Sequence, residues 1–249
     1  MVSLLTLAAP VSAASAPLPA AAERFKPFVA AGIAQSLASA KTMREHMAAQ
    51  DLAGAQQAWL TARAGWERAE IVSDEFFPDL DTAIDAWPNG KLGFHAVEAR
   101  LFGAHKTDAV AEADALVASL MAFEEKLKTA ALTPQGLLNG TAKLAYEIGE
   151  NKADGGESQF SGASLGDIRA NIAGIAEVYR TVFGPALHGS DAKRDAAMLK
   201  SIAALTDTAK APDLKSLDAA ALRRHSEELA LAFRDAAPLL GLAAPNLGN

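Results

Sequence analysis

The chain has 249 residues, of which 50% are hydrophobic and only 6% aromatic, and its formal net charge is −7. This length allows one large or two small hydrophobic cores, and the negative charge disfavours nucleic acids and anionic membrane surfaces as partners. Because there is no cysteine, disulfides and thiolate metal ligands are excluded.

The first 20 residues are expected to be a signal peptide or a disordered tail. A short apolar run at residues 4–9 precedes a run of small residues at 11–16, a pattern typical of a secretory signal with cleavage after Ala13 or Ala16. The run is too short to span a bilayer. The basic residues that usually begin a signal are missing, so a disordered Ala/Pro tail is the alternative. The signal interpretation predicts a periplasmic or secreted protein.

From residue 21 onward the hydrophobic pattern has helical periodicity, and no strand pattern competes with it. Asp51 and the pair Thr133–Pro134 are placed as helix starts. The expected helices are Ala21–Ala49, Leu52–Phe76, Leu92–Phe102, Asp108–Ala130, Pro134–Gly149, Ser164–Phe183, Asp191–Ala209 and Leu217–Leu240. The sequence therefore predicts an all-α protein.

The second expected helix carries a row of charged residues directly beside its apolar side. Arg63, Glu67, Glu70 and Asp74 follow each other at intervals of three or four residues. Like charges at this spacing destabilise a helix by a few tenths of a kcal/mol, roughly, for each pair, unless Arg63 or a bound cation neutralises them. An ordinary solvated acidic face is the alternative interpretation.

A short acidic segment follows and is interpreted as a connection between helices. It contains Asp79, Asp81 and Asp85. Carboxylates at this position can complete a coordination sphere that neighbouring helices begin.

The third expected helix contains a His and a Glu three residues apart. At this spacing His95 and Glu98 lie on one face, with their Cβ atoms about 5–6 Å apart, so they can bind one metal ion. The alternative is a structural histidine paired with its own i+3 carboxylate. Together with Glu67 and Glu70, the pair forms an oxygen-rich set with one imidazole, which suits iron, manganese or zinc.

The segment between residues 149 and 162 is rich in glycine and serine and is long for a connection between helices. Glu157 and Ser161 within it are candidates for groups that cap the site. A solvated, mobile loop is the alternative.

Several of these segments resemble, in order and spacing, the imelysin-like proteins, which include the EfeO and EfeM periplasmic iron-uptake components. The segments are Ala62–Glu70, Asp79–Asp85, Gly93–Glu98, and Gly155–Ser161 followed by Asp167–Tyr179. The resemblance implies a fold of two packed four-helix bundles, which we expect at about 21–130 and 131–249. It also implies a metal site at Glu67, Glu70, His95 and Glu98, with Asp81 or Asp85 as a further ligand.

Three functional classes follow. The first is a periplasmic metal-binding protein of an iron-uptake system, with a transition metal, most simply iron, as its ligand and other uptake components as partners. The second is a metallopeptidase of the imelysin type, although a second metal-binding histidine is missing because Ala99 follows Glu98. The third is a helical module for an extracellular ligand. No stable membrane anchor is expected, since the lipid-bearing cysteine of lipoproteins is absent.

Overall fold

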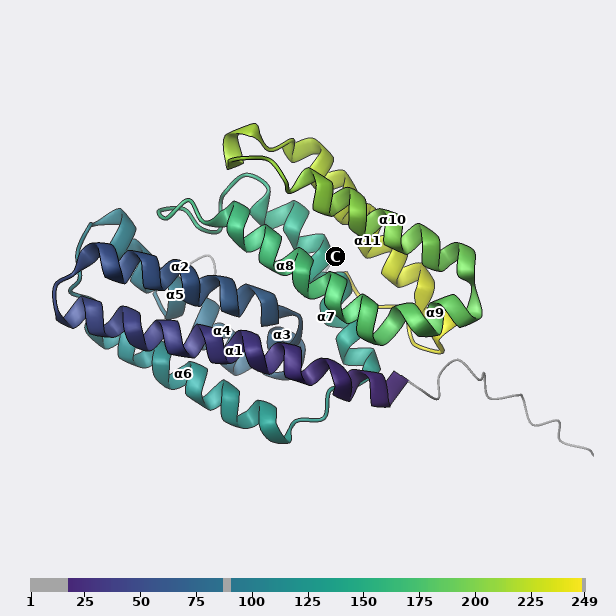
Figure 1. Cartoon of the computed structure of the whole chain (residues 1–249), viewed down its shortest axis with the longest axis horizontal. Coiled ribbons are helices and arrows are strands. Elements are labelled where there is room, and N and C mark those ends of the chain that lie inside the picture. The colour runs from purple at the N-terminus through teal and green to yellow at the C-terminus, as the bar shows by residue number, and fades with distance from the viewer. Residues whose placement is uncertain (1–17, 87–90, 248–249) are drawn as a thin grey trace, which may run out of the picture.

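The computed structural model describes residues 18–86 and 91–247, and within these ranges every regular element is a helix. The all-α class is therefore confirmed (Figure 1). No helix in the described ranges combines the length and apolarity that crossing a membrane requires. The proposed cleavage positions Ala13 and Ala16 lie outside the described residues.

The helices fall into two groups along the chain. The first group is α1 (Leu18–Ala48), α2 (Leu52–Ala69), α3 (Ser73–Phe76), α4 (Pro78–Asp85), α5 (Gly93–Glu98) and α6 (Val110–Thr129). The second is α7 (Pro134–Glu147), α8 (Ser164–Val178), α9 (Gly184–Ser190), α10 (Ala192–Thr208) and α11 (Ala219–Ala236). Short 3₁₀ segments are η1 (Glu70–Val72), η5 (Leu214–Ser216) and η6 (Ala237–Leu240), and π-helical segments are η2 (Ala99–Gly103), η3 (Ile148–Lys152) and η4 (Tyr179–Phe183).

Local signals explain most helix starts. The Asp51 carboxylate accepts a hydrogen bond from Gly54 N at 3.0 Å, and Thr133 Oγ1 accepts one from Gly136 N at 3.1 Å, so both predicted N-caps are confirmed. The prediction of a non-helical connection at residues 79–85 is wrong. A proline at the first position and two aspartates in the first turn favour helix α4 there.

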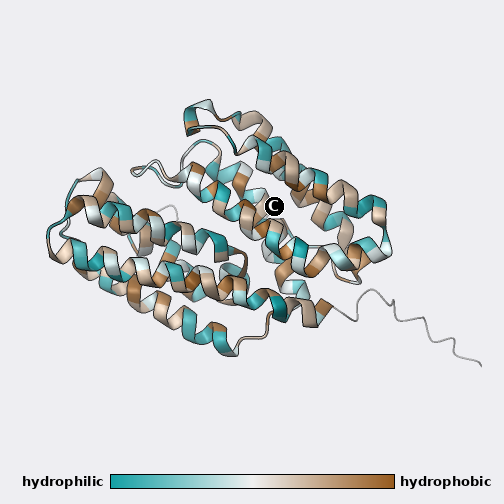
Figure 2. Ribbon diagram, viewed as in Figure 1, coloured by the Kyte–Doolittle hydropathy of each residue, from teal (hydrophilic) through white to brown (hydrophobic). Residues whose placement is uncertain are grey.

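The two groups share a continuous hydrophobic core. In Figure 1, α1, α2 and α6 run alongside one another, α7, α8, α10 and α11 form the other side, and α8 packs on α2 across the boundary. Figure 2 shows hydrophilic and hydrophobic residues along each long helix, as expected for helices with one face on a core. The division into two separate four-helix bundles stays a prediction, because the buried side chains of both groups form one cluster.

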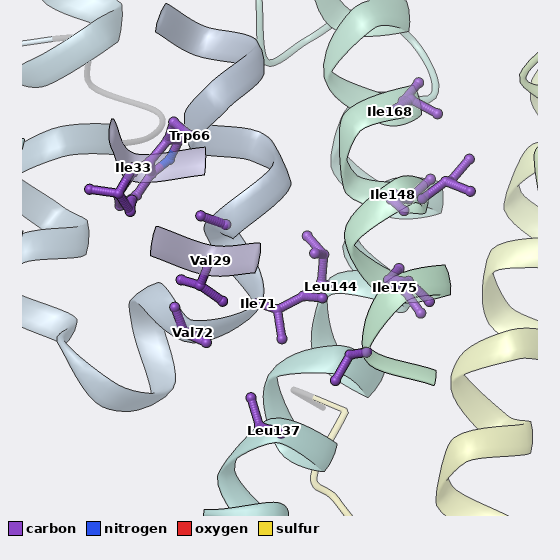
Figure 3. Close-up of a cluster of buried hydrophobic side chains, with 14 of the residues drawn as sticks. Val29, Ile33, Trp66, Ile71, Val72, Leu137, Leu144, Ile148, Ile168 and Ile175 are labelled. Atoms are coloured by element: carbon purple, nitrogen blue, oxygen red, sulfur yellow. The ribbon is translucent and has the colours of Figure 1, made fainter. Parts of the chain in front are cut away.

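Figure 3 shows that part of this core lies where α1, α2, α7 and α8 meet. The labelled side chains come from both groups: Val29, Ile33, Trp66, Ile71, Val72, Leu137, Leu144, Ile148, Ile168 and Ile175. Helix α2 is thus held on both sides. It is the helix that carries Arg63 and Glu67.

Helices α1 and α2 approach each other through two glycines. A Cβ atom on Gly65 would lie 2.8 Å from Gly32 O and 2.8 Å from Ser36 N, closer than real Cβ contacts. Backbone atoms cannot move aside as a flexible side chain can. Glycine at position 65 therefore sets the distance between α1 and α2.

We predict that Gly65→Ala destabilises the protein by about 1–3 kcal/mol, the usual cost of inserting a methyl group into a close-packed contact. Gly166→Ala is the matched control, because a Cβ there has no neighbour within 4 Å and alanine is the better helix former. Urea unfolding followed by circular dichroism measures both. Equal stability of the two variants would contradict the close-approach interpretation.

Candidate metal centre

Arg63 of α2 lies at the centre of a buried group of carboxylates. Its side chain is fully buried, and its Nη2 atom lies 2.5 Å from Glu67 Oε1 and 2.5 Å from Glu157 Oε1. Nη1 is paired with Asp85, and Nε lies 3.7 Å from Asp167 Oδ2. One guanidinium therefore draws together acids from α2, α4, α8 and the 153–163 loop.

Aromatic residues fix the guanidinium and its partner Asp85. The Phe94 ring of α5 lies 5.5 Å from Arg63 Cζ, and Trp66 Nε1 donates to Asp85 Oδ2 at 2.8 Å. Burial alone would raise the pKa of Asp85, but Arg63 and His95 hold this pKa well below its usual range. Asp85 is therefore an ionised carboxylate inside the protein.

A second buried cation, Lys152, comes from the π-helical segment η3. Its Nζ donates to Glu67 Oε2 at 2.7 Å and to Glu70 Oε2 at 3.1 Å, and it lies 3.1 Å from Glu157 Oε1. The residue is only 2% exposed. Glu67 is thus paired with both Arg63 and Lys152, and Glu70 is paired with Lys152.

Asn171 of α8 completes the surroundings of Glu67 and Glu70. Its Nδ2 donates to the main-chain oxygen of Glu67 and to both carboxylates at 2.7–2.8 Å. Burial raises the pKa of Glu67, but Arg63 and Lys152 outweigh it and the net shift is downward. Burial and the charge of Glu67 raise the pKa of Glu70 well above its usual value.

His95 lies between two carboxylates on a short helix. Helix α5 begins at Gly93, whose φ of +61° favours glycine and whose Cβ would overlap the main-chain oxygen of Ile84. His95 Nδ1 lies 3.3 Å from Glu98 Oε2, and Nε2 lies 3.1 Å from Asp85 Oδ1. Burial lowers the pKa of His95, but hydrogen bonds to the two acids raise it to about 9.

The second oxygen of Glu98 binds the 153–163 loop. Glu98 Oε1 accepts hydrogen bonds from Phe160 N at 3.2 Å, Ser161 N at 2.9 Å and Ser161 Oγ at 2.7 Å. The structure therefore brings the predicted site residue Ser161 onto Glu98. The alternative of a solvated loop is wrong at Glu157, which is 6% exposed and paired with both buried cations.

Two overlapping groups of ligand atoms are spaced closely enough to hold a metal ion. Among the described residues these are Asp85, His95 and Glu157, and Glu67, Glu70 and Glu157, with the ligand atoms in each group within 4.8 Å of one another. They share Glu157. The predicted ligands Asp81 and Glu98 belong to neither group.

A pocket of about 370 Å³ connects this cluster to solvent. Glu70, Asp85, Lys152 and Glu157 line it on the inside, and Asp74, Asp81, Lys143 and Glu147 contribute further out. Burial raises the pKa of Asp81 to about 6. Asp74 is exposed and paired with Lys143, so the solvated-face interpretation holds for that end of the stripe.

Three residues of the site were not predicted from the sequence: Lys152, Asp167 and Asn171. Asp167 and Asn171 are four residues apart on a helix whose buried side is otherwise rich in isoleucine. Two polar residues on an apolar face were a readable signal. For Lys152 the sequence offered no such signal, because it ends the π-helical segment η3 and precedes a glycine-rich loop.

Comparison with known proteins finds a matching family model and several relatives. The family model described as Imelysin matches residues 21–92 and 89–237. The chain is 29% identical to "Iron uptake system component EfeO" of Yersinia pseudotuberculosis over 62% of this chain and 44% of that protein. It is 31% identical to an "Efem/EfeO family lipoprotein" of Staphylococcus haemolyticus over 61% of this chain and 56% of that protein. The chain therefore spans about half the length of these curated relatives.

A solved structure shares the fold. The crystal structure of a protein described as an iron-regulated protein A precursor, from Parabacteroides distasonis, superposes with a TM-score of 0.69. The match covers 92% of this chain and 95% of that chain at 16% sequence identity. At this identity the likeness shows the fold alone.

We predict that the metal-free protein loses stability as pH rises from 5 to 9. Burial raises the pKa of Asp167 from 3.8 to about 7, and the pKa of His95 rises from 6.5 to about 9. Both groups hold protons more tightly when folded, so stability falls between pH 4 and 7 for Asp167 and between pH 6.5 and 9 for His95. At about 1.4 kcal/mol for each pKa unit, the change is on the order of 3–4 kcal/mol for each group.

Melting temperatures of chelator-treated protein measure this dependence. Asp167→Asn should flatten the fall between pH 5 and 7 and leave the fall above pH 7 in place. A melting temperature that rises steadily from pH 5 to 9 would contradict the raised pKa values.

Proposed function

The chain belongs to the imelysin family, and from this premise we propose that it is a periplasmic or secreted component of an iron-uptake system that binds a transition metal, iron, as cargo. The observation that carries the proposal is the meeting of two metal-ligand groups at Glu157, inside the protein and next to a pocket. Relatives named as iron-uptake components support the choice of metal.

The donor chemistry fits such a cargo. Carboxylate oxygens with one imidazole suit iron, manganese and zinc, and exclude the soft sites that copper(I) prefers. The buried carboxylates of Glu67 and Asp85 are held ionised by neighbouring cations. They need not lose a proton before they bind.

Within the His-x-x-Glu pair, we propose that only His95 binds the metal directly and that Glu98 orients it. His95 Nε2 is the proposed ligand atom, because it lies on the side of Asp85 and Glu157. Glu98 holds the other ring nitrogen and is proposed to orient the imidazole. An outer carboxylate on a metal-binding histidine is a common arrangement. Asp81 is proposed to lie on the path of the ion through the pocket.

We predict that the protein binds Fe(II), Mn(II) or Zn(II), and that His95→Ala and Glu157→Gln each weaken binding by at least about 10–100-fold, the scale known even for outer groups of metal sites. Anaerobic calorimetric titration measures the dissociation constants. His188→Ala is the control, because His188 is 69% exposed and paired with Asp195 at the far group of helices. Equal binding by wild type, His95→Ala and Glu157→Gln would place any metal site elsewhere.

We also predict that the metal-loaded protein does not hydrolyse peptides. The carboxylate beside His95 is the natural candidate for a water-activating base, but Glu98 Oε1 already accepts three hydrogen bonds from the loop. Mass spectrometry of a mixed peptide pool would detect new termini. Cleavage that disappears in Glu98→Ala would establish the peptidase alternative.

A further inference from the structure

The two buried cations of the metal centre differ in their freedom to move. Arg63 is enclosed: it contacts four carboxylates and the Phe94 ring and does not line the pocket. Lys152 contacts carboxylates on one side and lines the pocket on the other. A lysine side chain also has a flexible stem of four carbons, whereas the guanidinium fork of arginine is rigid.

The Lys152 ammonium lies where a metal ion would bind. Its three carboxylate neighbours, Glu67, Glu70 and Glu157, are the members of one of the two metal-ligand groups. The ammonium holds their oxygens at 2.7–3.1 Å, whereas a transition metal would draw carboxylate oxygens to about 2.0–2.2 Å. The three carboxylates therefore cannot bind a metal ion and hold the Lys152 ammonium in its present position at the same time.

The protein offers Lys152 another position. The adjoining pocket has a volume of about 370 Å³ and is lined further out by Glu147 and Asp81. Burial raises the pKa of Glu147, and the charges of Lys143 and, to a smaller extent, Lys152 lower it. An ammonium that leaves the three carboxylates would therefore enter an acidic, partly hydrated space.

Asn171 is an independent indication that the space beside Glu67 and Glu70 can accept a metal ion in place of the ammonium. The residue is fully buried and its Nδ2 faces the carboxylates of Glu67 and Glu70, while Oδ1 has no hydrogen-bond partner among the described residues. Turning the amide by half a rotation would present an oxygen, which is a metal ligand, in place of a donor.

We propose that Lys152 is a displaceable internal counter-ion that sets the metal affinity of the centre. In the metal-free protein its ammonium neutralises Glu67, Glu70 and Glu157. When a metal binds these carboxylates, the ammonium moves into the pocket. The inference rests on the proposed function, since it concerns how the same centre binds its cargo. Competition from Lys152 weakens binding and speeds release, as a protein that passes its cargo on requires.

The first test is the metal affinity of Lys152→Gln, with Lys128→Gln on the surface of α6 as the control. We expect Lys152→Gln to bind Zn(II) and Mn(II) at least about tenfold more tightly, with slower dissociation, because the metal no longer competes with a buried counter-charge. Lys128→Gln should stay within about twofold of wild type, because Lys128 is exposed, pairs with Glu125 and does not line the pocket. Equal or weaker binding by a folded Lys152→Gln would overturn the proposal and make Lys152 a structural bridge.

The second test uses the wild-type protein, because Lys152→Gln leaves buried carboxylates unpaired and folds less stably. Protein labelled with [¹⁵N]lysine reports the Nζ resonance of each lysine, and Lys152→Arg assigns the resonance of Lys152. Saturation with Zn(II) should shift the Lys152 signal and make its protons exchange faster with water. An unchanged Lys152 signal in zinc-saturated protein would overturn the proposal. A wild-type protein that binds neither metal refutes the proposed function itself, which is a separate result.

Discussion

The structure depends on the burial of Arg63 among carboxylates at the boundary between the two groups of helices. A buried charge is tolerated only where partners compensate for its lost hydration, and here those partners come from α2, α4, α8 and the 153–163 loop. Segments distant in sequence must therefore be in place before the guanidinium is satisfied. The same requirement gathers acidic side chains around Arg63. The burial of this one residue therefore accounts both for the packing of these segments and for the carboxylate cluster.

Around Arg63 there are more carboxylates than cations, and this excess determines the protonation of the site. Six acidic side chains lie around Arg63, Lys152 and His95: Glu67, Glu70, Asp85, Glu98, Glu157 and Asp167. Burial raises the pKa of Glu70, Glu157 and Asp167, whereas neighbouring cations lower the pKa of Glu67 and Asp85. Some of these acids are thus held as anions and others take up protons more readily, and perturbed pKa values of this kind are concentrated at functional sites.

Sequence reasoning reached the helical class and the two helices that carry Glu67 and His95, because hydrophobic periodicity and i, i+3 spacing are local properties. It also predicted Asp85 and Glu157 as candidates, without their partners. The role of Lys152 could not be predicted, because the position of this residue depends on the π turn of η3 and on the path of the following loop. No local sequence pattern specifies either of them. Asp81 and Asp85 show the same limit: they lie one turn apart on α4 and both line the pocket, yet Asp85 is the one that pairs with the buried Arg63.

The π-helical segment at Ile148–Lys152 has a consequence for the history of the family. A π turn closes its hydrogen bonds one residue later than an α turn, so it accommodates a single inserted residue without ending the helix. Deleting one residue there would restore regular α geometry and rotate the following side chain by about 100°, which would turn the ammonium away from the three carboxylates. A one-residue gap in an alignment at this point would therefore separate relatives that carry this cation from relatives that do not, even where all acidic ligands are retained.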